Sequence, residues 1–322
     1  MPPSPQPPVL VVRLSNWIGD VVLMLPSLLR LSEAYTLHLV GKGWMPGLLA
    51  GYGWPCHVYP KKLGQRVALL RRLAAAGPAG TRAEALCFPT SLSSALEFRL
   101  AGLPAVGYAK EGRSLLLRRA LPVPHAGVHM AEHFAQLASA LLPVGATEPA
   151  AVLRLSSDAL ARARAALAQA GAAPAFVAVC PFSSGTIGGE SKEWPGFGEL
   201  VARLKAEGHC LVACPGPGEE QQLAERWPEV LPLPGLGVDV YAAVLSLAAA
   251  VVANDTGPGH LAAAVGTPLV SVLGPTDPAR WGPRGAHVHV LRDWPQWPTV
   301  AAVHRQLGGL LPRSPQRAGA AL

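Results

Sequence analysis

The strongest chemical signal in the chain is a polar turn between two apolar runs. Residues 251–276 read VVANDTGPGHLAAAVGTPLVSVLGPT, a pattern of strand, turn, helix and strand. In such units the turn opens at the carboxyl end of a sheet, where ligands of open α/β sheets bind. The turn offers Asp255, Thr256, Gly257 and the N–H groups of a helix start, which suit a sugar and a phosphate. His260 is as readily a satisfied histidine of the first helical turn as a ligand contact.

A second turn, RLSNWIGD at residues 13–20, brings an acid to the start of a helix. Asp20 could serve there as a helix cap or as a first-turn acid that the helix dipole stabilises. It could also be a general base that takes a proton from an acceptor hydroxyl. The turn lacks the Gly-x-Gly-x-x-Gly fingerprint of dinucleotide-binding proteins, which argues against an NAD enzyme.

The third segment, PFSSGTIGGESKEWP at residues 181–195, follows a buried strand. Ser183, Ser184 and Thr186 supply hydroxyls, and Lys192 can pair with a phosphate as a point charge. Taken alone, the segment could be an ordinary loop with one more surface lysine. Beside the other two turns it favours phosphate binding.

The spacing of apolar residues predicts strands that alternate with helices, which indicates doubly wound parallel sheets. We expect strands at 9–14, 36–40, 85–88, 106–108, 176–180, 209–214, 251–253, 269–273 and 287–291. We expect helices at 20–32, 61–76, 92–100, 130–142, 156–170, 219–226, 239–247 and 300–311, with a further helix opened by Trp194-Pro195 and a cap at Asp239.

The alternation restarts after residues 143–145. We therefore expect two Rossmann-like domains, residues 1–150 and 151–322, with a last helix that could pack back on the first domain. Two such halves facing each other across a cleft form the GT-B fold of many nucleotide-sugar glycosyltransferases.

The basic residues are unevenly placed. Residues 1–150 hold 14 Lys/Arg and 7 Asp/Glu, whereas residues 151–322 hold 13 of each. The basic clusters are either solvated helix faces or a surface for an acidic partner. No nucleic-acid motif is present, so an anionic acceptor substrate is favoured over nucleic acid.

Other classes of protein are disfavoured by what the sequence lacks. The longest apolar run is too short to span a bilayer, and no signal peptide precedes the first strand. The five cysteines show no metal-ligand spacing, and we expect all of them to be reduced in a cytoplasmic protein. No Asp-x-Asp pair is present to hold a divalent cation.

The three segments together resemble glycosyltransferase family 9, the ADP-heptose:lipopolysaccharide heptosyltransferases, over most of the chain. SNWIGDVVLMLPSL is similar to the family's amino-terminal motif, SKEWP to its Lys-x-Trp-Pro, and NDTGPGHLAAAVGTPLVSVLGPTDP to its strongest signature. CFPTSLSSALEFRLAGLPAVGYAKEGRSLLL is similar to the heptosyltransferase II branch.

The resemblance implies roles for particular residues. Asp20 would be the catalytic base, and Lys192 would hold the donor phosphates. The remaining donor-site residues would be Gly19, Ser183, Ser184, Thr186, Asp255, Thr256, Gly257 and His260, with Glu219 near the ribose and Leu236 near the adenine. The residues expected to face the acceptor or a membrane are Lys61, Lys62, Arg66, Arg113, Arg118 and Arg119.

The resemblance also implies a reaction, an inverting and metal-independent transfer of heptose from ADP-heptose to a lipopolysaccharide inner-core acceptor, with no cofactor. The partners would be the nucleotide-sugar donor and an anionic lipid-linked oligosaccharide, with peripheral contact to the inner face of the cytoplasmic membrane. One alternative is a family relative that uses another nucleotide sugar or acceptor. Another is a degenerate member that binds a nucleotide sugar without turnover.

Overall fold

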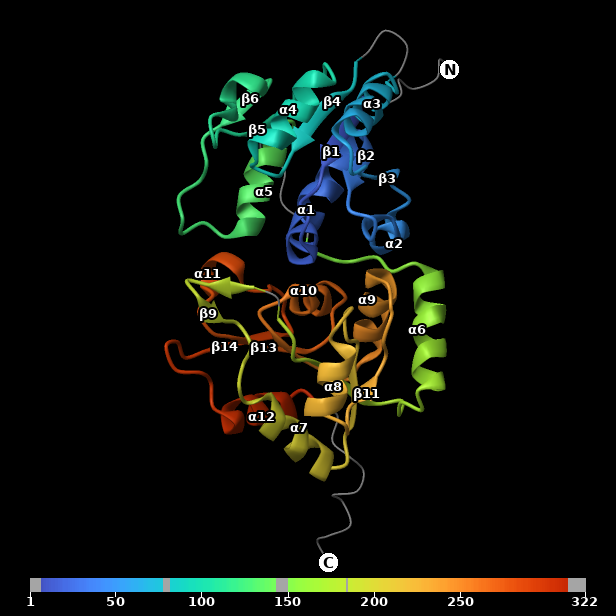
Figure 1. The fold of residues 1–322 in the computed structure, drawn as a ribbon, viewed down its shortest axis with the longest axis vertical. Coiled ribbons are helices and arrows are strands. Elements are labelled where there is room, and N and C mark those ends of the chain that lie inside the picture. The colour runs from blue at the N-terminus through green and yellow to red at the C-terminus, as the bar shows by residue number, and fades with distance from the viewer. Residues whose placement is uncertain (1–6, 78–81, 143–149, 184, 312–322) are drawn as a thin grey trace, which may run out of the picture. The chain divides into compact units, whose positions relative to one another are not determined.

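The chain consists of two α/β units (Figure 1). The computed structural model describes residues 7–77, 82–142, 150–183 and 185–311. The units are Met1–Arg154 and Leu155–Leu322, compared with an expected boundary at residue 150. None of the described helices is long and apolar enough to cross a membrane.

The first unit is built on a sheet of six parallel strands in the order β3-β2-β1-β4-β5-β6. Its strands are β1 (Val9–Arg13), β2 (Thr36–Gly41), β3 (Cys56–Val58), β4 (Glu84–Cys87), β5 (Val106–Tyr108) and β6 (Arg119–Leu121). Its helices are α1 (Ile18–Ala34), α2 (Met45–Leu48), α3 (Leu63–Ala74), α4 (Leu92–Leu100) and α5 (Met130–Ser139), with 3-10 turns η1 (Ala50–Tyr52) and η2 (Arg113–Leu116).

The second unit repeats this order, with a sheet β11-β10-β7-β12-β13-β14. Its strands are β7 (Phe176–Cys180), β8 (Thr186–Ile187), β9 (Glu190–Ser191), β10 (Cys210–Ala213), β11 (Leu231–Pro232), β12 (Ala250–Asn254), β13 (Leu269–Leu273) and β14 (Val288–Arg292). Its helices are α6 (Ser157–Gln169), α7 (Phe197–Ala206), α8 (Glu220–Arg226), α9 (Val238–Leu247), α10 (Gly257–Ala264), α11 (Pro278–Trp281) and α12 (Val300–Gly308).

Both sheets have the strand order of doubly wound Rossmann-like domains, so the predicted α/β class is confirmed. Successive strands are added on one side of β1 up to β3 and then on its other side from β4 onward. In the second sheet the same reversal of strand order lies between β7 and β12. Ligands of such sheets bind at this switch point, outside the carboxyl ends of the strands. The turns after β1, β7 and β12 are those that the sequence singled out for their chemistry.

The central strands of both sheets are continuous apolar runs that are buried on both faces. All residues of β1, β7, β12 and β13 are buried, as is usual for parallel strands covered by helices on both sides. The sequence left open a return of the last helix to the first domain. In the structure α12 packs against α7 and β13 of the second unit, where Val303 and Leu307 join the core.

Several local expectations are corrected. Trp194-Pro195 precedes α7, whose N-cap is Gly196. Asp239 is not a cap: Gly237 takes that position in α9, and the Asp239 carboxylate contacts Arg162 at 3.4 Å.

The sequence pattern also failed to predict several short elements. The edge strands β3 and β6 and the β8–β9 hairpin were not predicted. Gly188 and Gly189 both have positive φ, which allows the two-residue turn of that hairpin.

Candidate functional site

Asp20 lies in the first turn of α1, after the carboxyl end of β1. Trp17 holds the N-cap position, so Asp20 is a first-turn acid and not the cap, and Gly19 lies beside it in the same turn. The Ser15 hydroxyl donates a 2.5 Å hydrogen bond to Asp20 Oδ2. Burial raises the pKa of Asp20, and the bond from Ser15 opposes that rise. A carboxylate with a raised pKa is the stronger base, which suits proton abstraction.

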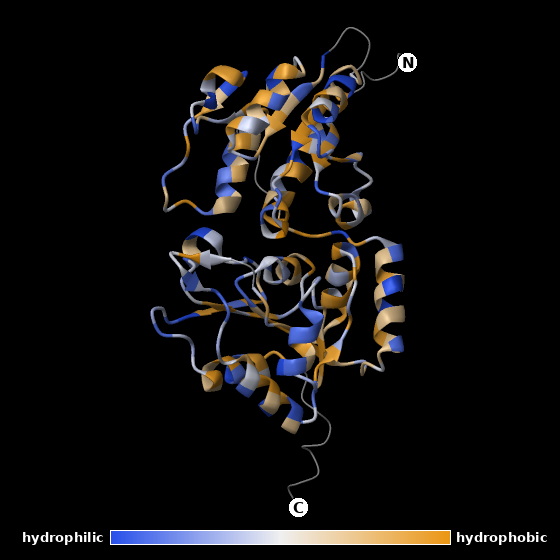
Figure 2. Cartoon of the chain, in the orientation of Figure 1, coloured by the Kyte–Doolittle hydropathy of each residue, from blue (hydrophilic) through white to orange (hydrophobic). Residues whose placement is uncertain are grey.

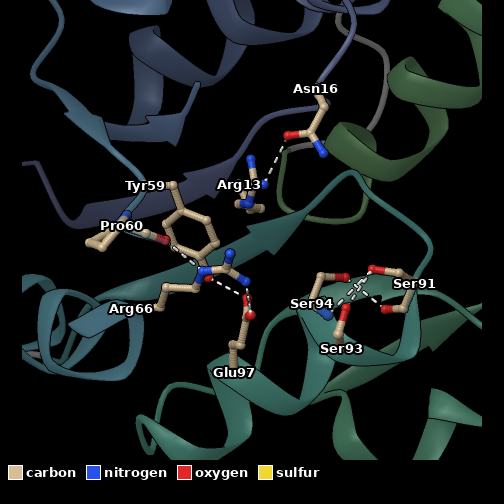
Figure 3. Close-up of polar contacts among 9 residues, drawn as sticks. All are labelled: Arg13, Asn16, Tyr59, Pro60, Arg66, Ser91, Ser93, Ser94 and Glu97. Carbon is tan, nitrogen blue, oxygen red and sulfur yellow. Dashed lines mark hydrogen bonds and ion pairs between the residues drawn. The ribbon is translucent and has the colours of Figure 1, made fainter. Parts of the chain in front are cut away.

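Two arginines share one tyrosine at the same edge of the first sheet (Figure 3). The guanidinium carbons of Arg13 and Arg66 lie 4.3 and 5.1 Å from the centroid of the Tyr59 ring. The Tyr59 hydroxyl and Arg66 also bond to the two oxygens of Glu97, at 2.5 and 2.7 Å. Glu97 is only 4 % exposed. The charge of Arg66, which was expected to face the acceptor, is therefore largely compensated by an internal ion pair.

The prediction that Arg113 faces an acceptor or a membrane is wrong, because its side chain is 0 % exposed. Its guanidinium donates to the carbonyls of Tyr108, Pro89 and Ser91 at 2.8, 2.6 and 3.1 Å, and to the Ser94 hydroxyl at 3.1 Å. Arg113 thus ties β5 to the start of α4. There Ser91 is the N-cap and accepts a hydrogen bond from the backbone N–H of Ser94.

The other basic candidates lie nearer the surface. Lys61 and Lys62 are exposed just before α3. Arg118 pairs with Glu84 at 2.7 Å, and Arg119 donates to the carbonyl of Ala140 at 3.0 Å.

In the second unit, Lys192 and Asp255 come together from the turns after β7 and β12. Lys192 Nζ lies 3.0 Å from the Asp255 carbonyl oxygen and 3.3 Å from Asp255 Oδ2. The Thr276 hydroxyl donates to the same Oδ2 at 2.5 Å. The Lys192 and Asp255 side chains are 19 % and 9 % exposed, so the pair lies at the margin between protein and solvent. An ammonium has three N–H donors, which leaves donor capacity for a phosphate oxygen.

A buried asparagine holds the ends of the Lys192 segment. Asn254 ends β12 and is 0 % exposed. Its Oδ1 accepts a 2.9 Å bond from the Trp194 backbone N–H, and its Nδ2 donates to the Pro181 carbonyl. One side chain therefore fixes both ends of residues 181–194 against the end of β12.

The expected hydroxyls of this segment have different surroundings. Ser183 Oγ is buried and has no hydrogen-bond partner among the described residues, while its N–H donates to Glu193 Oε1 at 3.2 Å. Thr186 lies in β8 and is exposed. Ser184 lies outside the described residues. Ser183 is thus a buried hydroxyl with hydrogen-bonding capacity to spare.

The remaining residues of the strongest motif open α10. Thr256 is the N-cap, and its hydroxyl lies 3.4 Å from the Asn254 carbonyl oxygen. Gly257 begins the helix. His260 is 7 % exposed and lies within the first turns of α10. The start of this helix therefore lies next to the Lys192–Asp255 pair.

The two weakest donor-site predictions lie along other loops of the second unit. Glu219 precedes α8, and its Oε2 accepts a 2.7 Å bond from the Gly216 N–H. Leu236 is half-buried in the loop before α9.

Thr276, Asn254 and Ser15 are three polar residues to which the sequence assigned no role. All three lie inside the quoted motifs, so their position in a motif was the signal that could have found them. Within the described parts of the chain, no three His, Cys, Asp or Glu side chains gather as a metal site would require.

Comparison with protein families gives a match to the model described as glycosyltransferase family 9 (heptosyltransferase), over residues 82–306. Lipopolysaccharide heptosyltransferase 1 of Pseudomonas aeruginosa is 38 % identical over 117 residues, which are 34 % of this chain and 33 % of that protein. The Escherichia coli K12 protein of the same name is 37 % identical over 110 residues, 32 % of this chain and 34 % of that one. The matched part of the chain thus spans about a third of the length of these curated relatives.

Solved structures show the same fold over nearly the whole chain. An Escherichia coli ADP-heptose lipopolysaccharide heptosyltransferase II has a TM-score of 0.76 at 24 % identity, covering 94 % of this chain and 98 % of that one. A family 9 glycosyltransferase from Veillonella parvula has a TM-score of 0.77 at 17 % identity, covering 89 % and 86 %. These neighbours confirm the GT-B fold. The names of the relatives include both heptosyltransferase 1 and II, so the expected likeness to the II branch stays a prediction.

Proposed function

Because the chain belongs to glycosyltransferase family 9, we propose that it transfers a heptose from ADP-heptose to a lipopolysaccharide inner-core acceptor. The proposal rests on one observation: Lys192 and Thr276 both donate hydrogen bonds to Asp255, beside the carboxyl ends of β7 and β12. This is the switch point of a doubly wound sheet, where such folds bind nucleotides.

The donor diphosphate would bind to Lys192 and to the N–H groups at the start of α10. Charge develops on the diphosphate as the glycosidic bond breaks, and a fixed cation with oriented dipoles stabilises it. The buried Ser183 hydroxyl adds a further donor. Asp255, held by Thr276, would bind hydroxyls of the sugar.

Asp20 would remove the proton from the acceptor hydroxyl. The acceptor oxygen then attacks the anomeric carbon, the bond from that carbon to the diphosphate oxygen breaks, and ADP departs. One base and one cation suffice for this single displacement, which inverts the anomeric configuration. The raised pKa of Asp20 supports its role as a base.

We propose that the transfer needs no divalent cation, since Lys192 supplies positive charge to the leaving group and the sequence has no Asp-x-Asp pair. Activity of the EDTA-treated enzyme should equal that of the untreated enzyme. A requirement for added magnesium would refute this part of the proposal.

The first unit would receive the acceptor, an anionic oligosaccharide on a lipid anchor. Its excess of basic residues over acidic ones supports this role. The enzyme would then work in the cytoplasm at the inner face of the cytoplasmic membrane.

Calorimetric titration with ADP-heptose, ADP-glucose and UDP-glucose tests the donor. We expect selective binding of ADP-heptose that Lys192→Ala weakens by about tenfold or more, since a hydrogen bond to a charged group contributes about 1.5–3 kcal/mol. Lys205→Ala, which removes an exposed lysine of α7, is the matched control. Tight binding of a different nucleotide sugar would leave the fold in place and overturn the heptosyl assignment.

Turnover tests the base. Asp20→Asn should abolish transfer while donor affinity stays unchanged, with Glu33→Gln, an exposed acid at the far end of α1, as the control. A chain that binds ADP-heptose and shows no turnover with any lipopolysaccharide precursor would be a binding protein instead.

A further inference from the structure

Helix α4 buries two polar residues beside Ala95 and Phe98, and it exposes three leucines. The carboxylate of Glu97 and the hydroxyl of Ser94 belong to buried residues, which are 4 % and 5 % exposed. Leu92, Leu96 and Leu100 are 45 %, 39 % and 46 % exposed. Residues four apart lie on one side of a helix, so the three leucines form a continuous apolar stripe on the surface.

A fourth leucine extends this stripe. Leu115 is 93 % exposed and belongs to η2, which packs against α4. We call Leu92, Leu96, Leu100 and Leu115 the leucine face. In Figure 2 apolar and polar residues both occur along α4 and along the neighbouring segment before β6. A helix on a protein surface normally turns its polar side to water, and a group of exposed apolar residues marks a docking surface.

The orientation of α4 is fixed by contacts inside the unit. Glu97 is held by Arg66 and Tyr59, and Ser94 by Arg113. These bonds, together with the burial of Phe98, hold one side of α4 inward and leave the leucines outward. The leucine face is therefore a built feature of the fold, not one rotamer or one loop.

The charges around the leucine face indicate what it binds. Residues 59–121 hold eleven Lys or Arg and three Asp or Glu. Arg113 is buried, and Arg66 and Arg118 are paired with Glu97 and Glu84. Eight Lys or Arg and one acid, Glu111, remain outside these contacts. At one end of the stripe, Arg71 donates to the Leu100 carbonyl at 3.0 Å and Arg99 is exposed on α4. Near the other end, Lys110 is exposed beside Glu111, whose carboxylate lies 3.4 Å from the Leu92 N–H.

Leucines surrounded by cations match an anionic lipid surface. The apolar side chains enter the boundary between headgroups and acyl chains, while each nearby Lys or Arg gains from the negative surface potential. We propose that the leucine face is the surface by which this protein docks on an anionic bilayer.

This inference rests on the proposed function, and it also explains how a lipid-linked acceptor could be reached. Helix α4 begins next to Ser91, just after the carboxyl end of β4. The carboxyl edge of the same sheet carries Asp20 after β1. A membrane that contacts α4 would therefore lie beside the edge at which the acceptor hydroxyl must be deprotonated.

The test is co-sedimentation of the full-length protein with vesicles of phosphatidylcholine containing 30 mol % phosphatidylglycerol, beside vesicles of phosphatidylcholine alone. The first variant is Leu96→Glu/Leu100→Glu, which places charge on the exposed stripe. The second is Arg71→Glu/Arg99→Glu. Val152→Glu is the matched control, because Val152 is 54 % exposed in the same unit and lies outside the leucine face.

We expect the wild-type protein to bind the anionic vesicles, and both double variants to lower its partition coefficient by about tenfold or more. The control should bind like the wild type. Binding that the leucine variant leaves unchanged would overturn the proposal. So would a leucine variant that converts a dimer to a monomer in sedimentation velocity, because the face would then be the interface with a second copy.

A second readout separates this inference from the proposed function. Transfer to an acceptor embedded in vesicles should fall in both double variants, whereas transfer to a deacylated, water-soluble acceptor should not change. Vesicle binding without transfer to either acceptor would refute the proposed function and leave the docking surface standing.

Discussion

Replacing Asn254 with alanine should destabilise the second unit strongly, although Asn254 contacts no substrate in the proposed reaction. The variant leaves the Trp194 N–H and the Pro181 carbonyl without the partners that Asn254 gives them. Both residues are buried, and Trp194 is 2 % exposed. A buried polar group without a partner costs about 1–3 kcal/mol, so two such groups cost about 2–6 kcal/mol. That is a large part of the 5–15 kcal/mol that is typical of a whole domain.

Urea unfolding followed by tryptophan fluorescence measures this loss. Trp194 lies against the altered site and Trp227 packs in the same core, so the transition of the second unit is visible. Gln169 is an exposed amide side chain at the end of α6 in the same unit. Gln169→Ala is therefore the control, and we expect it to change the stability by less than about 1 kcal/mol, as surface substitutions usually do.

Asn254→Asp gives a sharper test of the same reasoning. An ionised aspartate can accept from the Trp194 N–H but cannot donate to the Pro181 carbonyl. A protonated one can do both, and burial raises the pKa of such a carboxyl. With a folded-state pKa above the unfolded one, the deficit in stability should be full at neutral pH and shrink as the pH falls. An Asn254→Ala variant within about 0.5 kcal/mol of the wild type, or an Asn254→Asp deficit that does not depend on pH, would refute the argument.

Four further outcomes are expected. Ser15→Ala removes the bond that holds down the pKa of Asp20, so the acid limb of the pH–rate profile should move to higher pH; an unmoved limb would mean that another group sets it. Burial raises the folded-state pKa of Asp20 above its unfolded value, so the ionised carboxylate costs stability as the pH rises through that pKa. Asp20→Asn should therefore raise the melting temperature at pH 7, with a gain that fades in acid; a lower melting temperature would contradict this. Thr276→Val should weaken calorimetric donor affinity by about tenfold, whereas unchanged affinity would show that Asp255 needs no support from the hydroxyl. Arg113→Met should cost about 3 kcal/mol or more in urea unfolding, because the carbonyls of Tyr108 and Pro89 and the other acceptors of Arg113 lose their donor, and a loss below about 1 kcal/mol would mean that water replaces the guanidinium.

The sequence predicted the framework of this protein because buried parallel strands have a simple sequence pattern. Strands such as β7 and β12, buried on both faces, appear as unbroken apolar runs. Their polar turns follow at once, so the sequence alone places Lys192 and Asp255 at one sheet edge. The structure adds that they contact each other at 3.3 Å.

What the sequence did not predict depends on contacts between distant segments. Arg113 looked like one more surface arginine, because nothing near it in the chain shows that the carbonyls of Pro89 and Tyr108 would surround it. Glu97 and its leucine neighbours were indistinguishable from an ordinary amphipathic helix until the partners of Glu97 were known. The edge strands β3 and β6 are three residues long and partly exposed, so they lack the apolar run that identified the central strands.

Asn254 bonds to both Pro181 and Trp194, so the chain between them is a closed loop. The positions of its two ends are set by Asn254 and not by the residues within the loop. The entropy of closing a loop grows only with the logarithm of its length, and doubling the length costs about 0.6 kcal/mol. Residues added at the Gly188-Gly189 turn should therefore alter the free energy of unfolding little. Lys192 lies two positions before the fixed end at Trp194, so it would keep its place beside Asp255. Length in this loop is thus a variable that evolution or a protein engineer can change independently of the phosphate-binding lysine.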